Sequence, residues 1–210
     1  MDDERQVEMD CLAAIFPEMV IDAQDPFSAS IELPVNPNAP VKVVFPASAE
    51  PSAPALPSPP RSESSGEGGQ VALQPAQNLE SHNLSYLPAL RLHITLPEGY
   101  PSKRAPIFEL STAPAWLSRS YLDDLQNKGE HMWEEGGHTE IVYGYIDSLQ
   151  QAAENAFGHS DGEALVVPQD FKIALLDYDI KATQATFEKE TFECGVCLGK
   201  MITGKHRGPP

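Results

Sequence analysis

The sequence has few cysteines, few basic side chains and no long apolar run, and each shortage narrows the possible functions. Only three of its 210 residues are cysteine, and two of them, Cys194 and Cys197, lie close together. An odd count with this spacing is a poor disulfide framework, which predicts a reducing compartment, cytoplasmic or nuclear. No apolar run approaches the roughly 20 residues of a membrane span, and the start, MDDERQVEMD, lacks the features of a secretory signal.

Basic side chains are outnumbered: 14 lysines and arginines face 31 aspartates and glutamates, for a formal net charge of −17. An acidic surface repels phosphate backbones and anionic lipid headgroups, so we expect neither nucleic acid nor a membrane as a partner. The same charge is compatible with a basic protein partner. It also has a simpler explanation, because acidic surfaces keep many proteins soluble.

Apolar residues at helical spacing predict a helix at the start of the chain, with Val7, Cys11, Leu12 and Ile15 on its buried stripe. On that stripe we expect Cys11 to be a small buried thiol and not a reactive one.

Alternating apolar and polar residues predict four strands. They fall at residues 27–35, 41–45, 90–96 and 107–110, the first two forming a hairpin and the third carrying His93 on its polar, solvated side. Two helices are expected after them, the first ending at the glycine pair 136–137 and the second running from Val142 to a stop at Gly158. This order predicts an α+β fold: an N-terminal helix, a four-stranded antiparallel meander and two C-terminal helices packed on one sheet face.

Two segments interrupt or follow this pattern. Residues 47–80 are rich in proline, serine and glycine, and they have too little apolar surface to offset the entropy of ordering, so we expect a disordered insert within the domain. Residues 159–190 are expected to form a connector that is partly helical.

The segment LPALRLHITLPEGYPSKRAPIFEL, residues 87–110, resembles the signature of the RWD domain. That family has a helix, four strands and two helices, with a Tyr-Pro-x-x-x-Pro turn between its last two strands. Tyr100 and Pro101 match the turn, whereas Ala105 stands at the second proline's position and Pro106 follows one residue later. The resemblance covers residues 1–158 apart from the insert. It implies a domain that docks on a protein partner, with a buried Tyr100 in a structural turn.

RWD domains resemble ubiquitin-conjugating enzymes in fold, and those enzymes need a cysteine nucleophile beside the sheet. Here no cysteine lies between Leu12 and Glu193. We therefore expect no ubiquitin thioester on this domain.

Cys194-x-x-Cys197 has the spacing with which two thiolates hold one Zn²⁺. Three interpretations stay open from the spacing alone: the start of a RING finger, an inert dithiol and a redox pair. The segment LLDYDIKATQATFEKETFECGVCL, residues 175–198, is similar to the entry into the first RING of RING-between-RING ubiquitin ligases of the RING finger protein 14 type. Members of that group begin with an RWD domain.

The resemblance implies a ligase that takes ubiquitin from a ubiquitin-conjugating enzyme onto a cysteine in its last RING. After Cys197 the sequence contains no further cysteine, and His206 is the one other candidate zinc ligand. We therefore expect residues 191–210 to be an incomplete first RING that binds zinc weakly, on a chain that is inactive alone. The alternative is a free-standing RWD adaptor with no enzymatic role.

Overall fold

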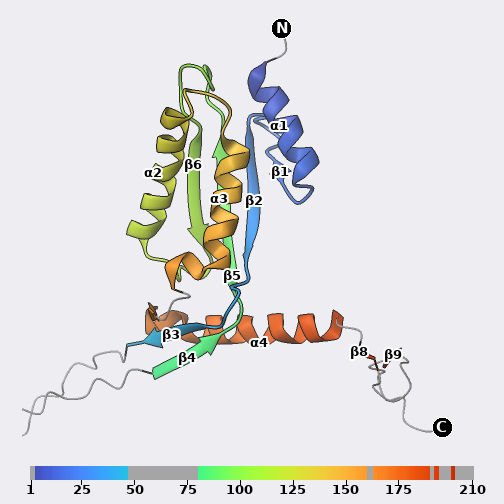
Figure 1. Cartoon of the computed structure of the whole chain (residues 1–210), viewed down its shortest axis with the longest axis vertical. Coiled ribbons are helices and arrows are strands. Elements are labelled where there is room, and N and C mark those ends of the chain that lie inside the picture. Colours follow the sequence, from blue (N-terminus) through green and yellow to red (C-terminus); the bar gives the residue numbers. More distant parts are fainter. Residues whose placement is uncertain (1–2, 47–79, 160–162, 190–191, 194–199, 202–210) are drawn as a thin grey trace, which may run out of the picture.

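The computed structural model describes residues 3–46, 80–159, 163–189, 192–193 and 200–201. These residues form an α+β fold with an N-terminal helix, antiparallel strands and C-terminal helices, as predicted (Figure 1). Most of the predicted insert and the residues Cys194, Cys197 and His206 lie outside the described part of the chain.

The central sheet has four antiparallel strands in the order β1-β2-β5-β6. They are β1 (Val20–Ile21), β2 (Ser28–Val35), β5 (Leu87–Thr95) and β6 (Ile107–Thr112). Alternate residues of the three longer strands are buried and form the floor of the core, because side chains along a strand point to opposite faces.

Helices α2 (Arg119–Glu135) and α3 (Val142–Glu154) cover one face of this sheet (Figure 1). Gly129 allows α2 to approach β6 closely, since a Cβ at that position would collide with the ring of Phe108. The Phe108 ring stacks on Tyr145 of α3 with 3.9 Å between centroids. A side chain at position 129 would therefore separate the helix from the sheet.

The prediction that residues 27–35 and 41–45 form a hairpin is wrong. Strand β3 (Val41–Phe45) pairs with β4 (Glu80–Leu84) and, in parallel, with β7 (Leu165–Val166), in a separate sheet. Strand β2 pairs with β5, and the next strand, β3, pairs with β4, which comes directly before β5 in the sequence. The two pairings thus continue one another. The sequence gives little indication of β4, because only one of its residues is buried.

The prediction for the first helix, α1 (Glu4–Ile15), is right in place and wrong in orientation. Cys11 is exposed, and Val7 and Ile15 are 47% and 53% exposed. Of the predicted stripe Leu12 is buried, as expected, and the helix turns Met9 and the carboxyl group of Glu8 toward the core beside it.

The remaining elements follow α3. They are the short helices η1 (Ala156–Gly158) and η2 (Gln169–Phe171), the helix α4 (Lys172–Lys189), and the paired strands β8 (Phe192–Glu193) and β9 (Lys200–Met201). Helix α4 crosses the end of the central sheet, where Asp179 accepts hydrogen bonds of 2.8 Å from the amides of Ser85 and Tyr86 between β4 and β5 (Figure 1). Among the described residues, no helix is both long enough and apolar enough to cross a bilayer.

Two side chains from distant parts of the sequence cap the start of α3, which has no side-chain cap of its own. The hydroxyl of Tyr100 accepts a hydrogen bond of 3.1 Å from the amide of Ile141, and Oε1 of Glu8 accepts one of 3.1 Å from the amide of Val142. The first amides of a helix have no partner within the helix, so acceptors are needed there. We call this arrangement the α3 clamp. It joins α1, the turn after β5 and α3.

The turn itself is held against α2. As predicted, Tyr100 is buried, at 4% exposure, and Trp133 is buried too. Nε1 of Trp133 donates a hydrogen bond of 2.7 Å to the carbonyl of Pro101. The turn is thus part of the core's edge, as the resemblance implied.

Burial raises the pKa of Glu8, and the nearby charge of Glu140 acts in the same direction. The Tyr100 hydroxyl and the Val142 amide favour the ionised carboxylate but offset only part of this effect. Burial and the neighbouring Glu8 also raise the pKa of Tyr100, which therefore stays a neutral hydroxyl. Oε2 of Glu8 is buried and has no hydrogen-bond partner, so the ionised form is poorly satisfied.

Replacing Tyr100 by phenylalanine should lower the free energy of unfolding by about 1–3 kcal/mol, because the Ile141 amide loses its acceptor. Tyr100→Ala should cost at least about 3 kcal/mol, since the buried ring is lost as well. Urea unfolding followed by circular dichroism measures both. Tyr143→Phe, at a tyrosine that is 54% exposed, is the matched control and should change nothing. Equal stability of Tyr100→Phe and the wild type would contradict the clamp.

The contribution of Glu8 to stability should fall as the pH rises above the ordinary glutamate pKa of 4.5. In that range the unfolded state releases the Glu8 proton more readily than the folded state does, so raising the pH favours unfolding until Glu8 ionises in the folded protein too. Glu8→Gln keeps the acceptor for Val142 and removes the titration. Thermal unfolding from pH 4 to pH 8 measures the stability of both proteins. The variant should gain stability relative to the wild type as the pH rises. A difference independent of pH would exclude Glu8 as the source.

Candidate functional site

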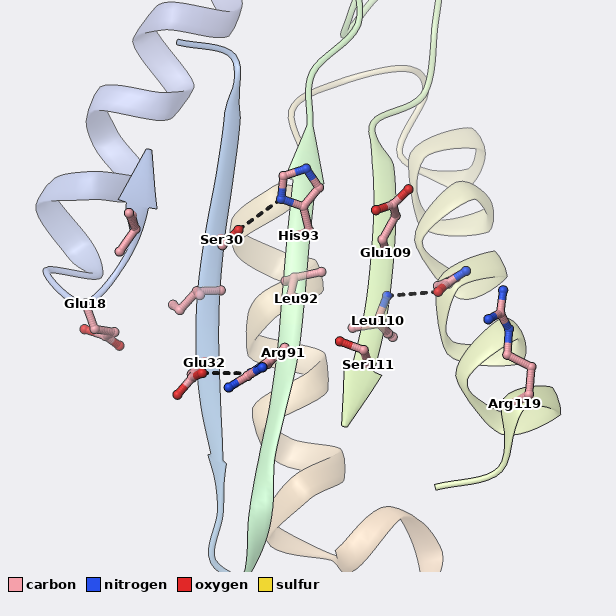
Figure 2. Close-up of a pocket in the computed structure, with 13 residues that line it drawn as sticks. Glu18, Ser30, Glu32, Arg91, Leu92, His93, Glu109, Leu110, Ser111 and Arg119 are labelled. Carbon is pink, nitrogen blue, oxygen red and sulfur yellow. Dashed lines mark hydrogen bonds and ion pairs between the residues drawn. The ribbon is translucent and has the colours of Figure 1, made fainter. Parts of the chain in front are cut away.

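The face of the central sheet opposite α2 and α3 carries a polar groove of about 930 Å³, which we call the open-face groove. Figure 2 shows its side chains, which come from the outward positions of β2, β5 and β6 and from the flanks of the sheet. The alternation that buries the side chains of Ile31, Leu92 and Leu110 places polar residues on this face, and these three residues and Val20 complete the lining of the groove. The lining residues used below are Glu18, Ser30, Glu32, Arg91, His93, Glu109, Ser111, Arg119 and Gln126.

Strand register sets these side chains in two rows across the sheet. In one row His93 lies between Ser30 and Glu109, and in the other Arg91 lies between Glu32 and Ser111. Directly opposed residues of antiparallel strands have Cβ atoms about 4.5–5.5 Å apart, so each row brings its polar groups within reach of one ligand.

His93 is held by two serines of β2. Its Nδ1 lies 3.0 Å from Oγ of Ser30, and its Nε2 lies 3.1 Å from Oγ of Ser28, which is buried. The prediction of a solvated histidine is therefore wrong in part: the ring is on the polar face but is half-buried and bonded at both nitrogens. A sequence pattern cannot show this, because Ser28 and Ser30 are 63 or more positions away along the chain.

Serine, histidine and glutamate on one face are the side chains of a hydrolase triad, but their geometry is different. A catalytic histidine needs a carboxylate at the nitrogen that faces away from the serine. Here that nitrogen also meets a serine, and within the described residues no carboxylate bonds to His93. The two serines hold the imidazole ring in one orientation, and this geometry differs from that of a hydrolase triad.

The charges of the open-face groove are unevenly paired. Nε of Arg91 donates a bond of 2.8 Å to Glu32, and Arg119 pairs with Asp123 on its own helix. Within the described part of the chain, Glu18 and Glu109 have no ion-pair partner. The groove therefore offers two carboxylates to a ligand and has its arginines already neutralised.

The predicted site residues lie elsewhere. Tyr100, Pro101 and Pro106 are in the turn and do not line the open-face groove. Cys194 and Cys197 are outside the described residues, which contain no group of three or more side chains able to hold a metal ion. In sequence the two cysteines fall between β8 and β9, which pair antiparallel. Prediction from sequence missed the open-face groove. Its one visible signal was the polar side of the strand that carries His93.

Comparison with known proteins agrees with the fold described above. The sequence matches the RWD domain family over residues 3–153. It is 27% identical to the E3 ubiquitin-protein ligase RNF14 of Danio rerio, over 60% of this chain and 35% of that protein. It is 31% identical to the human protein of the same name, over 33% of this chain and 14% of that one.

A second group of relatives carries a different name. Protein IMPACT-B of Xenopus tropicalis is 31% identical over 34% of this chain and 22% of that protein. The chain thus spans about a third or less of the curated relatives that it matches. No solved structure matches significantly. The family match alone covers residues 3–153, more than half of the sequence, and the chain therefore belongs to the RWD domain family.

Proposed function

We propose that this chain is the protein-binding module of a ubiquitin ligase of the RING-between-RING type. The observation that carries the proposal is an RWD domain in a chain whose relatives include E3 ubiquitin-protein ligases from fish and human. An adaptor without enzymatic activity is the second candidate, since the chain is also similar to Protein IMPACT-B, whose name is not that of a ligase.

In this proposal the described domain acts by binding and not by chemistry. Transfer of ubiquitin by such a ligase needs a cysteine that accepts ubiquitin from a conjugating enzyme. The domain has no cysteine between Leu12 and Glu193, and its exposed Cys11 has no base or cation bonded to it among the described residues. The conjugating enzyme would therefore be a partner of the complete protein, and the compartment would be cytoplasmic or nuclear.

The open-face groove is the surface that we assign to the protein partner. Glu18 and Glu109 supply acceptors without ion-pair partners, and the overall charge of −17 would steer a basic segment toward them. His93, fixed by its serines, adds polar recognition with little loss of side-chain entropy on binding. The partner segment would accordingly carry lysine or arginine.

A zinc finger is the proposed continuation after α4. Cys194 and Cys197 would be its first two ligands, and a structural zinc site needs four. Support comes from the spacing of the pair and from its position between β8 and β9, which are antiparallel. Two thiolates supply only two of the four ligands around a zinc ion. We therefore do not expect these two cysteines alone to drive the folding of a whole finger on binding zinc.

Reversing the charge of the open-face groove should remove partners. Proteins captured from cell extract by the wild type and by Glu18→Lys/Glu109→Lys are compared by quantitative mass spectrometry, and the partner captured most strongly by the wild type is then purified. We expect its affinity to fall about tenfold in the variant, since unpaired surface charges steer and orient binding. Glu135→Lys/Glu188→Lys changes the net charge equally at exposed sites outside the groove and is the control. If both variants lost affinity for the partner, or if neither did, the open-face groove would not be its binding surface.

Zinc should bind weakly to the 210-residue chain. Titration against a competing chelator should show weak binding that disappears in Cys194→Ser/Cys197→Ser and persists in Cys11→Ser, which removes the exposed thiol of α1. Tight stoichiometric binding would mean that His206 or a second chain completes the site, and the expectation of an incomplete finger would then be wrong.

A further inference from the structure

A second groove, of about 560 Å³, lies between α2 and the turn that joins β5 to β6. We call it the turn groove. Its lining residues used below are Pro97, Lys103, Arg104, Ala105, Pro106, Ile107, Gln126, Asn127 and Glu130. It shares only Gln126 with the open-face groove.

The turn groove is cationic on an otherwise acidic protein. Lys103 and Arg104 are adjacent and exposed, and neither forms an ion pair with any residue that the structure describes. Most other bases of the described chain are neutralised by carboxylates: Arg5, Arg91, Arg119, Lys172 and Lys181. Glu98, on the same turn, interacts electrostatically with Arg5 of α1. Glu130 is the one acidic residue in the lining of this groove, so the lining carries a net positive charge.

Apolar surface and amide donors accompany the two cations. Ile107 is 52% exposed at the start of β6, although it is a large aliphatic side chain, and Pro97 and Ala105 line the groove beside it. The side-chain oxygen of Gln126, Oε1, is already used, because it accepts a hydrogen bond of 2.9 Å from the backbone amide of Leu110. Among the described residues, the side-chain NH₂ group of Gln126 and the side chain of Asn127 have no hydrogen-bond partner. Both can therefore bind a ligand that brings acceptors.

The turn holds the cations in a fixed frame. The amide of Lys103 donates a bond of 2.8 Å to the carbonyl of Gly99, whose positive φ of 92° suits glycine. Pro101 is fixed to Trp133 by the bond described above, and Pro106 is buried at the other end. The backbone that carries Lys103 and Arg104 is therefore held in place before a ligand binds, which favours affinity.

From these observations we propose that the turn groove binds an acidic peptide segment of a protein partner. Aspartate or glutamate side chains would pair with Lys103 and Arg104, and one aliphatic side chain would pack on Ile107. A nucleic acid or an anionic membrane would also supply negative charge, but the net charge of −17 opposes those extended polyanions more strongly than a short peptide. The proposal rests on the domain's role as a protein-binding module and concerns a surface distinct from the one assigned above.

Selection from a random peptide library displayed on phage tests this directly, with the full chain immobilised. The expected result is enrichment of peptides with several acidic residues around one leucine or isoleucine. The best peptide, fluorescently labelled, should bind Lys103→Glu/Arg104→Glu about tenfold more weakly or worse, judged by fluorescence anisotropy, because attraction is replaced by repulsion. Its counterpart with glutamine in place of glutamate should lose affinity for the wild type.

Two matched controls separate this groove from general charge and from the open-face groove. Lys42→Glu/Lys128→Glu makes the same charge change at exposed lysines outside the groove and should bind like the wild type. Ile107→Ser should weaken binding, whereas Ile173→Ser, at an 81% exposed residue of α4, should not. Glu18→Lys/Glu109→Lys should leave the peptide bound, so failure of the open-face proposal would not affect this result.

Selected peptides without acidic residues, or acidic peptides that bind Lys103→Glu/Arg104→Glu as well as they bind the wild type, would overturn the proposal. Circular dichroism of each variant shows whether it is folded. The substituted residues are all exposed, so we expect native spectra.

Discussion

The clamp at the start of α3 is the constraint on which the rest of the structure depends. Tyr100 and Glu8 provide acceptors for the first amides of α3, and they come from the turn after β5 and from α1. Removing either acceptor would leave a polar group unsatisfied, as well as loosening a contact between elements far apart in sequence. In this chain the Tyr100 hydroxyl has a structural partner in the Ile141 amide, so no ligand is needed to explain its position.

With α3 and the turn fixed, the central sheet has two different faces. One is closed by α2 and α3, where Gly129, Phe108 and Tyr145 pack closely. The other face stays polar and carries the open-face groove, and the turn groove opens beside β6. The residues that line the two grooves include no cysteine, and we propose both grooves as surfaces for partner binding. Because the free charges of the two grooves are of opposite sign, contacts of both signs would orient a partner that spans them.

The sequence was most informative where one local pattern agreed with burial. Alternation correctly predicted β2, β5 and β6, and the glycines after Trp133 correctly predicted the end of α2. It failed where the pattern was weak or ambiguous. In α1 the apolar residues occupy two neighbouring stripes, and periodicity cannot decide which of them faces the sheet, so Cys11 was placed in the core although it is exposed.

By itself the sequence determined the fold class, the order of the helices and main strands, the Tyr100 turn and the lack of any cysteine between Leu12 and Glu193. These properties depend on residue type and local spacing. Tertiary structure alone decided that β3 pairs with β4, that Glu8 caps α3, and that His93 lies between two serines. Each of these is a contact between positions far apart in the chain, and a hydrogen bond or strand pairing of that kind leaves no periodic trace in the sequence.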